Sequence, residues 1–222
     1  MHIVVNAATS VDGKLSTRRR EQVRISGSAD FARVDRLRAD NDAVLVGVGT
    51  VLADDPHLTL DDDDRRDQRR ERGEAPNPAR VVVDSTGRTP LDSRILDDAA
   101  ETYLLTSQSI SGERRQDLEA AGATVLTAGT ERVDLDSALS ELEADGIEAL
   151  MVEGGGEVIH SLFAAGLVDE LSVYVGSLII GGRDAPTLVD GDGFVESFPS
   201  LSLRATTRID DGVLLEYDVD ER

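Results

Sequence analysis

The sequence predicts an α/β fold with a mainly parallel sheet, flanked by helices, and an antiparallel C-terminal edge. Short apolar runs alternate with amphipathic segments along most of the 222 residues, as in folds built from β-α-β units. Residues 149–182 are the clearest example, because an apolar run, three glycines, an amphipathic stretch and a second apolar run follow one another. Residues 201–209 and 213–219, separated by a turn at 210–212, predict a closing antiparallel hairpin.

The other elements follow from the same periodicities. Further apolar runs predict strands at residues 2–8, 43–48, 80–84, 102–105 and 123–127. Capping residues at 26–30 precede a helix that ends near Asp40, and polar amphipathic helices are expected at 112–121 and 135–144. We expect turns at 9–16 and 49–56, and a charged, mobile loop at 61–78. No domain boundary is visible, so we expect a single domain over residues 1–222.

Composition narrows the class of protein. There are 44 acidic and 23 basic residues, a net charge of -21, and a surface of that sign repels nucleic acid and anionic membranes. The absence of cysteine excludes disulfides and thiolate zinc sites, and three scattered histidines make a metal site unexpected. No apolar run has the roughly 20 residues of a membrane span. No secretory leader is visible either, so we expect a cytoplasmic protein.

The basic residues are 22 arginines and one lysine, Lys14. An excess of acid with almost no lysine is typical of halophilic proteins, so the composition predicts a halophilic source. Lys14 lies in the first turn, where it either serves a ligand or merely caps the loop. Asn6 interrupts the first strand, where it either caps the strand end or faces a ligand.

Glycines at 154–156 stand where a helix is expected to begin. A helix N-terminus carries unpaired N–H groups and a positive dipole end, which suits a phosphate. Glycine also lets a phosphate approach the backbone closely. The alternative is a simple tight turn, and the pattern departs from G-x-G-x-x-G because Ile159 occupies the last position. A hydroxyl-rich turn at 85–88, which includes Arg88, is a second place that could hold a phosphate.

Five stretches form a pattern in order and spacing: residues 6–14, 49–59, 80–85, 153–156 and 168–171. In these stretches the chain resembles the reductases of riboflavin biosynthesis, a family shared by stand-alone archaeal and fungal enzymes and by the C-terminal half of bacterial bifunctional deaminase-reductases. The resemblance implies a dihydrofolate reductase-like fold, a homodimer, and NADPH-dependent reduction of a phosphorylated ribosylaminopyrimidine.

The resemblance also implies which residues form the site. Those expected to hold the cofactor are Thr50, Asp54, Ser85, Gly155, Gly156, Glu157, Val158 and Ile159. Those expected to line the substrate pocket are Asn6, Lys14, Ser26, Arg38, Leu58 and Glu153. Neither a catalytic proton donor nor a metal ligand is indicated.

One departure from the family pattern concerns the substrate phosphate. Bacterial bifunctional members tend to place an arginine three residues after the position of Leu58, where this chain has Asp61. The resemblance therefore leaves phosphate recognition to other cations, such as Arg38 or Lys14.

The sequence also bears on which pyrimidine such a reductase would use. Because the matching motifs begin at residue 3 and the chain lacks the cysteines of a zinc deaminase, we expect the archaeal and fungal order of steps. The expected substrate is 2,5-diamino-6-(ribosylamino)pyrimidin-4(3H)-one 5′-phosphate. The alternatives are a reductase of the deaminated 5-amino-6-(5-phosphoribosylamino)uracil and a non-catalytic nucleotide-binding protein of the same fold. Dihydrofolate reductase itself is disfavoured, because only 3% of residues are aromatic.

Overall fold

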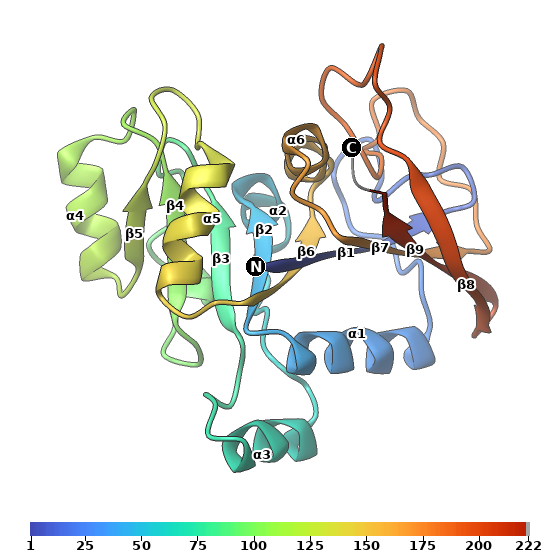
Figure 1. Cartoon of the computed structure of the whole chain (residues 1–222), viewed down its shortest axis with the longest axis horizontal. Coiled ribbons are helices and arrows are strands. Elements are labelled where there is room, and N and C mark those ends of the chain that lie inside the picture. The colour runs from blue at the N-terminus through green and yellow to red at the C-terminus, as the bar shows by residue number, and fades with distance from the viewer. Residues whose placement is uncertain (221–222) are drawn as a thin grey trace. The chain divides into compact units, whose positions relative to one another are not determined.

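Two structural units account for residues 1–220, the part of the chain that the computed structural model describes (Figure 1). The first unit comprises Met1 and residues 35–151, and the second comprises residues 2–34 and 152–220. Helix α1 (Ser28–Asp40) and strand β6 (Ala149–Gly154) run from one unit into the other.

The first unit contains a parallel sheet with the strand order β5-β4-β3-β2. Its strands are β2 (Ala43–Gly47), β3 (Ala79–Val83), β4 (Thr102–Thr106) and β5 (Thr124–Thr127). Its helical elements are α2 (Val48–Asp54), α3 (Asp63–Glu71), the 3-10 turn η1 (Arg94–Leu96), α4 (Gly112–Ala120) and α5 (Leu135–Ala144). Figure 1 shows α4 and α5 beside β5. The predicted parallel strands are thus confirmed.

Buried apolar side chains hold this sheet together. Every residue of β2 and of β4 is buried, as expected for strands covered on both faces. The core includes Val46, Val51, Leu58, Val82 and Leu104.

Arg80 is fully buried within β3. Its guanidinium donates to the carbonyls of His57, Ile95 and Asp97 and to the Asp97 carboxylate. A buried guanidinium is tolerated only when its donors are satisfied, and here they tie two surface segments to the sheet.

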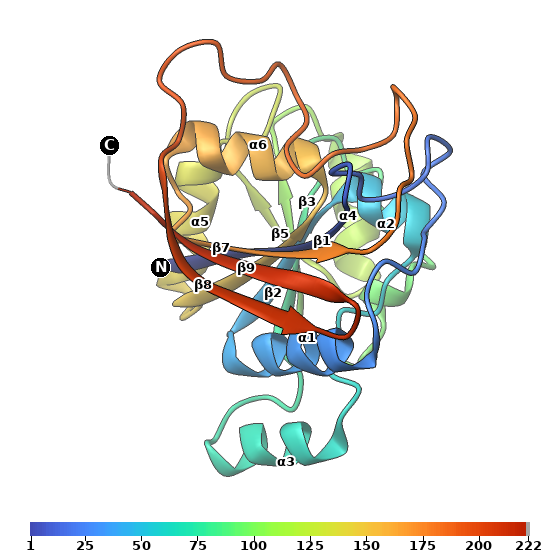
Figure 2. The same cartoon turned by 90° about the vertical axis from the view of Figure 1, so that its right-hand side faces the viewer.

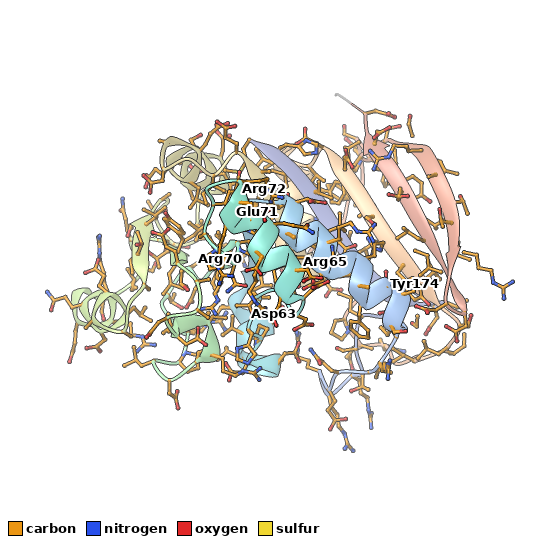
Figure 3. All side chains as sticks on the ribbon, turned by 90° about the horizontal axis from the view of Figure 1, so that it is seen from below. Asp63, Arg65, Arg70, Glu71, Arg72 and Tyr174 are labelled. Atoms are coloured by element: carbon orange, nitrogen blue, oxygen red, sulfur yellow. The ribbon has the colours of Figure 1, made fainter. Side chains whose placement is uncertain are left out.

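Helix α3 corrects the prediction of a loop at residues 61–78. Asp62 caps the helix by accepting from Asp64 N at 2.9 Å, and the first turn is acidic while the last carries Arg69 and Arg70. This charge order complements the helix dipole, so the run that suggested a solvated loop is a stable helix sequence. Figure 3 shows the labelled side chains of α3, among them Arg65, spread along this short helix.

A second correction concerns residues 49–56, which were expected to form only a turn. Val48–Asp54 is the helix α2, which starts directly after β2 and buries Val48 and Val51. Asp55 ends the helix in a left-handed conformation with φ of 40°. The helix has seven residues, so its periodicity covers fewer than two turns and is weak in sequence.

The second unit has the strand order β1-β7-β9-β8 (Figure 2). Its elements are β1 (His2–Ser10), α6 (Gly156–Ala165), β7 (Glu170–Gly176), β8 (Leu201–Ile209) and β9 (Gly212–Val219). β1 pairs with β7 in parallel, whereas β7 with β9 and β9 with β8 are antiparallel. The predicted antiparallel C-terminal hairpin is confirmed. In the described residues, no helix combines the length and apolarity needed to cross a membrane.

Helix α1 is capped by a residue far away in sequence. The Asp210 carboxylate, in the turn between β8 and β9, accepts from Ala29 N at 3.4 Å and from Asp30 N at 3.1 Å. A Cβ on Gly27 would lie 2.5 Å from the Asp210 side chain, so glycine leaves room for this cap. The capping residues expected near the helix start are therefore supplemented by a long-range one.

Candidate active site

In the first unit, Arg38 and the segment that contains Leu58 are joined directly. Arg38 is half-buried on α1, and its Nη1 donates to the Thr59 carbonyl at 3.0 Å. Asp61 N donates to the Asp35 carboxylate, also on α1, at 2.7 Å. Two bonds from one helix therefore fix this segment, and both predicted substrate residues of the unit lie together.

Thr50 and Asp54 lie one turn apart on α2, so both face the same side of the helix. Asp55, the next residue, accepts from Ser93 Oγ at 2.8 Å and from Arg94 N at 2.9 Å. The end of α2 is thereby anchored to the 3-10 turn η1. Thr50 and Asp54 are both partly exposed, so their side chains could contact a ligand.

Ser85 follows β3 at the carboxyl edge of the parallel sheet, where loops from three strands converge. Its carbonyl accepts from Ser107 N at 3.1 Å and from Ser107 Oγ at 2.9 Å, and its own Oγ accepts from Val133 N at 3.1 Å. A hydroxyl that accepts one bond still has its proton to donate to a ligand. The carboxyl edge of a parallel sheet is where ligands of such folds bind.

In the second unit, the N-terminus of α6 has backbone geometry that could hold an anion. Gly155 is its extended N-cap and makes no side-chain capping bond, while Val158 N and Ile159 N turn back to the Gly155 carbonyl. The N–H groups of Gly156 and Glu157 have no partner within the helix, since first-turn amides have none. These amides and the helix dipole favour a phosphate oxygen.

The three glycines of this turn have different surroundings. Gly154 has φ of 124° and open space within 4 Å of a Cβ built on it, whereas a Cβ on Gly156 would lie 2.5 Å from the Thr187 carbonyl oxygen and 2.7 Å from Asp190 Oδ2. Asp190 N also donates to the Gly156 carbonyl at 3.2 Å. Gly154 is thus favoured by its backbone conformation, while Gly156 allows the 187–190 segment to pack closely.

Asn6 belongs to a buried polar network between β1, β7 and α1. Arg33 donates to Asn6 Oδ1 at 2.8 Å, to Ser172 Oγ at 3.1 Å and to Asp30 Oδ1 at 2.8 Å. Because arginine can only donate, this contact identifies the Asn6 oxygen and leaves its NH₂ group for another partner. The network gives Asn6 a structural role that does not exclude ligand binding.

Lys14 lies in a loop that is tied to the 180–187 segment. Its Nζ donates to the Ala185 carbonyl at 3.1 Å, and its backbone forms an isolated bridge with Thr187. Asp12 accepts from Ile180 N at 3.0 Å and from Gly181 N at 2.7 Å. The Ser10 hydroxyl and these amides lower the pKa of Asp12 to about 2, so the clamp stays ionised. Lys14 thus makes the loop-capping contact, and two of its three ammonium protons remain to donate to a ligand.

The comparisons with known proteins give the family. The model of the RibD C-terminal domain matches residues 1–215. The chain belongs to the RibD C-terminal domain family.

Two relatives carry the same name. A 2,5-diamino-6-ribosylamino-4(3H)-pyrimidinone 5′-phosphate reductase of Archaeoglobus fulgidus is 48% identical over 195 residues, which is 88% of this chain and 89% of that protein. The protein of that name from Methanothermobacter thermautotrophicus is 43% identical, with 98% of each chain covered.

Solved structures confirm the dihydrofolate reductase-like fold. A pyrimidine reductase-like protein of Corynebacterium diphtheriae has a TM-score of 0.87 at 21% identity and covers 100% of this chain and 92% of its own. Dihydrofolate reductase of Enterococcus faecalis has a TM-score of 0.50 at 12% identity, covering 99% and 97%. Identities this low speak for the fold alone.

Within this RibD-type chain, two predicted site residues have side chains in the core. Leu58 is 2% exposed and Ile159 is fully buried, so only their backbone groups are free to face a ligand. Leu58 has φ of 54°, a left-handed conformation that is uncommon for leucine and recurs at ligand sites. Ser26 is buried just before α1, and Glu153 is half-buried near the end of β6.

Residues beyond the predicted set also shape the site. Arg33 orients Asn6, Asp12 fixes the Lys14 loop, and Asp190 packs against the start of α6. Only Arg33 leaves a sequence signal, because it stands three residues after Asp30 on the predicted helix. The other two act across more than 30 residues of sequence, which no local pattern reveals.

Proposed function

We propose that this protein is an NADPH-dependent reductase that converts 2,5-diamino-6-(ribosylamino)pyrimidin-4(3H)-one 5′-phosphate into its ribitylamino form in riboflavin biosynthesis. The observation that carries the proposal is the 48% identity, over nearly the whole of both chains, to a protein named for that reduction. The conformation of the α6 N-terminus supports it independently, because it suits a phosphate-bearing cofactor.

The reaction demands positioning more than acid or base catalysis. The sugar would open to an imine as the bond between C1′ and the ring oxygen breaks and the proton of the exocyclic N–H passes to that oxygen. A nicotinamide cofactor, when bound, would supply the hydride that C1′ accepts, and the imine nitrogen would take up a proton. The protein would hold donor and acceptor in contact.

The predicted site residues form two groups, one for the cofactor and one for the substrate. Gly155 and the first amides of α6 would bind phosphate oxygens, and the Ser85 hydroxyl would donate to another cofactor oxygen. Thr50 and Asp54 offer a hydroxyl and a carboxylate to the hydroxyls of the cofactor. Arg38 and Lys14 would meet anionic or carbonyl oxygens of the substrate, and Glu153 would accept from its amino groups.

The names of the two relatives specify the diamino compound and support it as the preferred pyrimidine. A site built to pair with a 2-amino group rejects an oxo analogue, because the acceptor that faces the amine would meet an oxygen instead. The deaminated uracil compound is therefore the expected poor substrate.

The experiment compares both pyrimidines with one enzyme preparation. NADPH oxidation is followed by absorbance with each compound in turn, in molar potassium chloride, and repeated with NADH. We expect a higher kcat/KM with the diamino compound and with NADPH. Faster oxidation with the uracil compound would reassign the substrate, and no oxidation with either would leave the non-catalytic alternative.

We further infer that the protein acts as a homodimer through the outer sheet of the second unit. From the strand register, one face of β8 and β9 carries Leu201, Leu203, Thr206, Arg208, Val213, Leu215, Tyr217 and Val219. Leu203 is 58% exposed and Val213 37% exposed, and the face includes no acidic residue. On a chain of net charge -21, an apolar face free of carboxylates is where a second copy could dock without repulsion.

The composition supports a halophilic archaeon as the source. Forty-four acidic residues against 23 basic ones, with a single lysine, suit a protein that folds in concentrated salt. The related proteins of Archaeoglobus fulgidus and Methanothermobacter thermautotrophicus agree with this proposal in lineage.

A further inference from the structure

The loop between β1 and α1 carries three consecutive arginines on a closed turn. This arginine turn (residues 17–21) is held by its first residue, since Arg20 N donates to the Thr17 carbonyl at 2.8 Å and Thr17 N to the Glu21 carbonyl at 3.2 Å. Thr17 Oγ1 also accepts from Arg19 N and Glu21 N. Arg18, Arg19 and Arg20 are all exposed, so the turn presents three guanidinium groups on an ordered backbone.

The three arginines are unpaired on a surface that is rich in acid. Among residues 1–220, no carboxylate comes within 4.0 Å of the guanidinium groups of Arg18, Arg19 and Arg20. Arginines elsewhere on the surface do find carboxylates: Arg70 pairs with Asp67 and Arg115 with Glu119. A chain with nearly two acidic residues for each basic one thus keeps its densest basic run free of them.

Contacts within the second unit connect the arginine turn to the phosphate-binding end of α6. A Cβ on Gly182 would lie 3.5 Å from Arg18 Cβ, so this turn packs against the 180–187 segment. That segment binds Asp12 at its start and Lys14 near its end, where the Thr187 carbonyl also approaches Gly156. Figure 2 shows the loop after β1 running beside the segment that follows β7. Lys14 and the arginines thus sit on the same scaffold as the α6 N-terminus.

We propose that Arg18, Arg19 and Arg20 form, with Lys14, a surface that binds a phosphate monoester of the reactants; this rests on the proposed reductase function. Guanidinium groups bind phosphate oxygens through paired, charge-assisted hydrogen bonds. Two reactants carry such a group: the pyrimidine has a 5′-phosphate and NADPH has a 2′-phosphate on its adenosine. Asp61 stands where bacterial bifunctional members tend to place an arginine, and its carboxylate offers no positive charge to a phosphate. Its N–H donates to the Asp35 carboxylate.

In molar salt, the arginine turn can act on a ligand only by direct contact. The screening length falls from about 10 Å at 0.1 M to about 3 Å at 1 M, so in molar salt these charges cannot steer a ligand from a distance. Three adjacent guanidiniums at contact distance still bind a dianion, because direct hydrogen bonds do not depend on the long-range field. The turn is therefore a binding element.

The test compares two triple variants of equal charge. Arg18→Gln, Arg19→Gln and Arg20→Gln together remove the arginine turn's charge, while Arg36→Gln, Arg70→Gln and Arg115→Gln remove three charges from other exposed positions. KM is measured for the phosphorylated pyrimidine, its dephosphorylated form, NADPH and NADH, in molar potassium chloride. All six positions are exposed, so both variants should fold, which circular dichroism checks.

We expect KM for one phosphorylated reactant to rise about tenfold in the turn variant and less than about twofold in the control. A rise for the pyrimidine that vanishes with its dephosphorylated form assigns the 5′-phosphate. A rise for NADPH that is absent with NADH assigns the 2′-phosphate. Equal effects in the two triple variants, or equal effects on phosphorylated and unphosphorylated reactants, would overturn the proposal.

A measurement without turnover separates this inference from the proposed function. Inorganic phosphate, added at constant ionic strength, should raise the thermal midpoint of the wild type and of the control triple more than that of the turn variant. If the wild type shows this shift but reduces neither pyrimidine, the anion surface stands and the reductase assignment fails. If it reduces the pyrimidine and all three proteins respond alike to phosphate, the anion surface fails alone.

Discussion

Single residues decide what the glycine turn before α6 can hold. Gly155 has φ of -83° and ψ of -178°, an extended conformation that any residue adopts, so its lack of a side chain is a matter of space and charge. Gly156 is constrained differently, because Thr187 and Asp190 occupy the position of its Cβ. The sequence pattern showed three equivalent glycines, and only the packing around them separates their roles.

Gly155→Asp tests the phosphate site at this turn. Aspartate is a favourable N-cap, so α6 should persist, but its carboxylate would repel a phosphate at the same amides. We expect NADPH affinity to fall at least about tenfold, or about 1.4 kcal/mol, by titration. Gly112→Asp, which places the same charge at the first residue of α4, is the control and should leave the affinity unchanged. Equal affinity in both variants would remove this turn from the cofactor site.

Local structure could be predicted where it rests on local chemistry. The glycine turn lies at a helix N-terminus as the sequence indicated, whereas Thr50 and Asp54 lie on a helix where a turn was expected, and the roles of all these residues stay predictions. The burial of Leu58 and the capping of α1 by Asp210 could not be foreseen, because each depends on residues distant in sequence. Leu58 lies in a left-handed bend against the core, and Asp210 accepts from Ala29 N, which is 181 residues away in sequence.

At the scale of elements, α3 supports the C-terminal end of α1. Arg69, 4% exposed, donates to the carbonyls of Ala39 and Asn41, each at 2.8 Å, and to that of Ala75 at 2.9 Å. Cations at a helix C-terminus satisfy its last carbonyls and complement its dipole. Burial lowers the pKa of Arg69, and arginine stays charged nonetheless. The segment expected to be a loop is therefore a brace for the helix that carries Arg38.

Arg69→Met should destabilise the protein through this brace. The variant keeps most of the apolar stem but removes the Arg69 bonds to the Asn41 and Ala75 carbonyls, while Ala39 keeps its bond from Arg72. We expect a cost of about 3 kcal/mol in the free energy of unfolding. Arg70→Met, next to it but exposed and paired only with Asp67, is the control and should cost less than about 1 kcal/mol. Denaturant titrations at one fixed salt concentration measure both. Equal midpoints for the two variants would show that the brace adds no stability.

Strand β8 is exposed along most of its length, and its two faces differ in charge. Arg204 on this strand pairs with Glu170 and Asp218 of the acidic face, which raises the pKa of Arg204 and lowers that of Glu170. The opposite face is apolar. The alternation of apolar and polar residues predicts hairpins of this kind. It does not predict what packs against the apolar face, because it shows only that one face is to be buried.

Leu203→Glu tests the apolar face as the dimer contact. A carboxylate there would be desolvated and would face its own copy across a two-fold axis, so we expect the mass in solution to fall from two chains towards one. Thr207→Glu adds the same charge on the other face of the strand and should leave the mass unchanged. Light scattering after size exclusion, in molar salt, gives both masses. A wild type of one chain's mass, or a Leu203→Glu variant that stays dimeric, would place the contact elsewhere.

For the whole molecule, the net charge of -21 dominates behaviour in solution. Like charges on one folded chain repel one another, and salt weakens that repulsion as the screening length shortens. The few ion pairs that salt would weaken are mostly exposed and contribute little.

Stability should therefore rise with salt. We expect the thermal midpoint to increase steadily between about 0.1 M and 1 M potassium chloride, because screening relieves self-repulsion over that range. Sucrose at matched osmolality serves as the control, since it alters hydration without screening charge. A thermal midpoint that does not change with potassium chloride, or that rises equally in sucrose, would contradict the prediction of a halophilic protein.

The fold class as a whole could be predicted because its signals are local. Continuous apolar runs marked the parallel strands, and alternation marked the hairpin. What the sequence could not provide was the pairing of β1 with β7, whose partners Val4 and Glu170 are 166 positions apart. Such long-range pairings are set by tertiary packing.

That separation has a consequence for synthesis. At about 5–20 residues per second, the ribosome completes β7 roughly ten to thirty seconds after β1 has been made. During this interval Ile3, Val4, Val5 and Ala7, all buried in the finished protein, lack the strand that will flank them. The newborn chain must keep its first apolar segment from pairing with its neighbours on other ribosomes, and the acidic segments that follow would hold those neighbours apart.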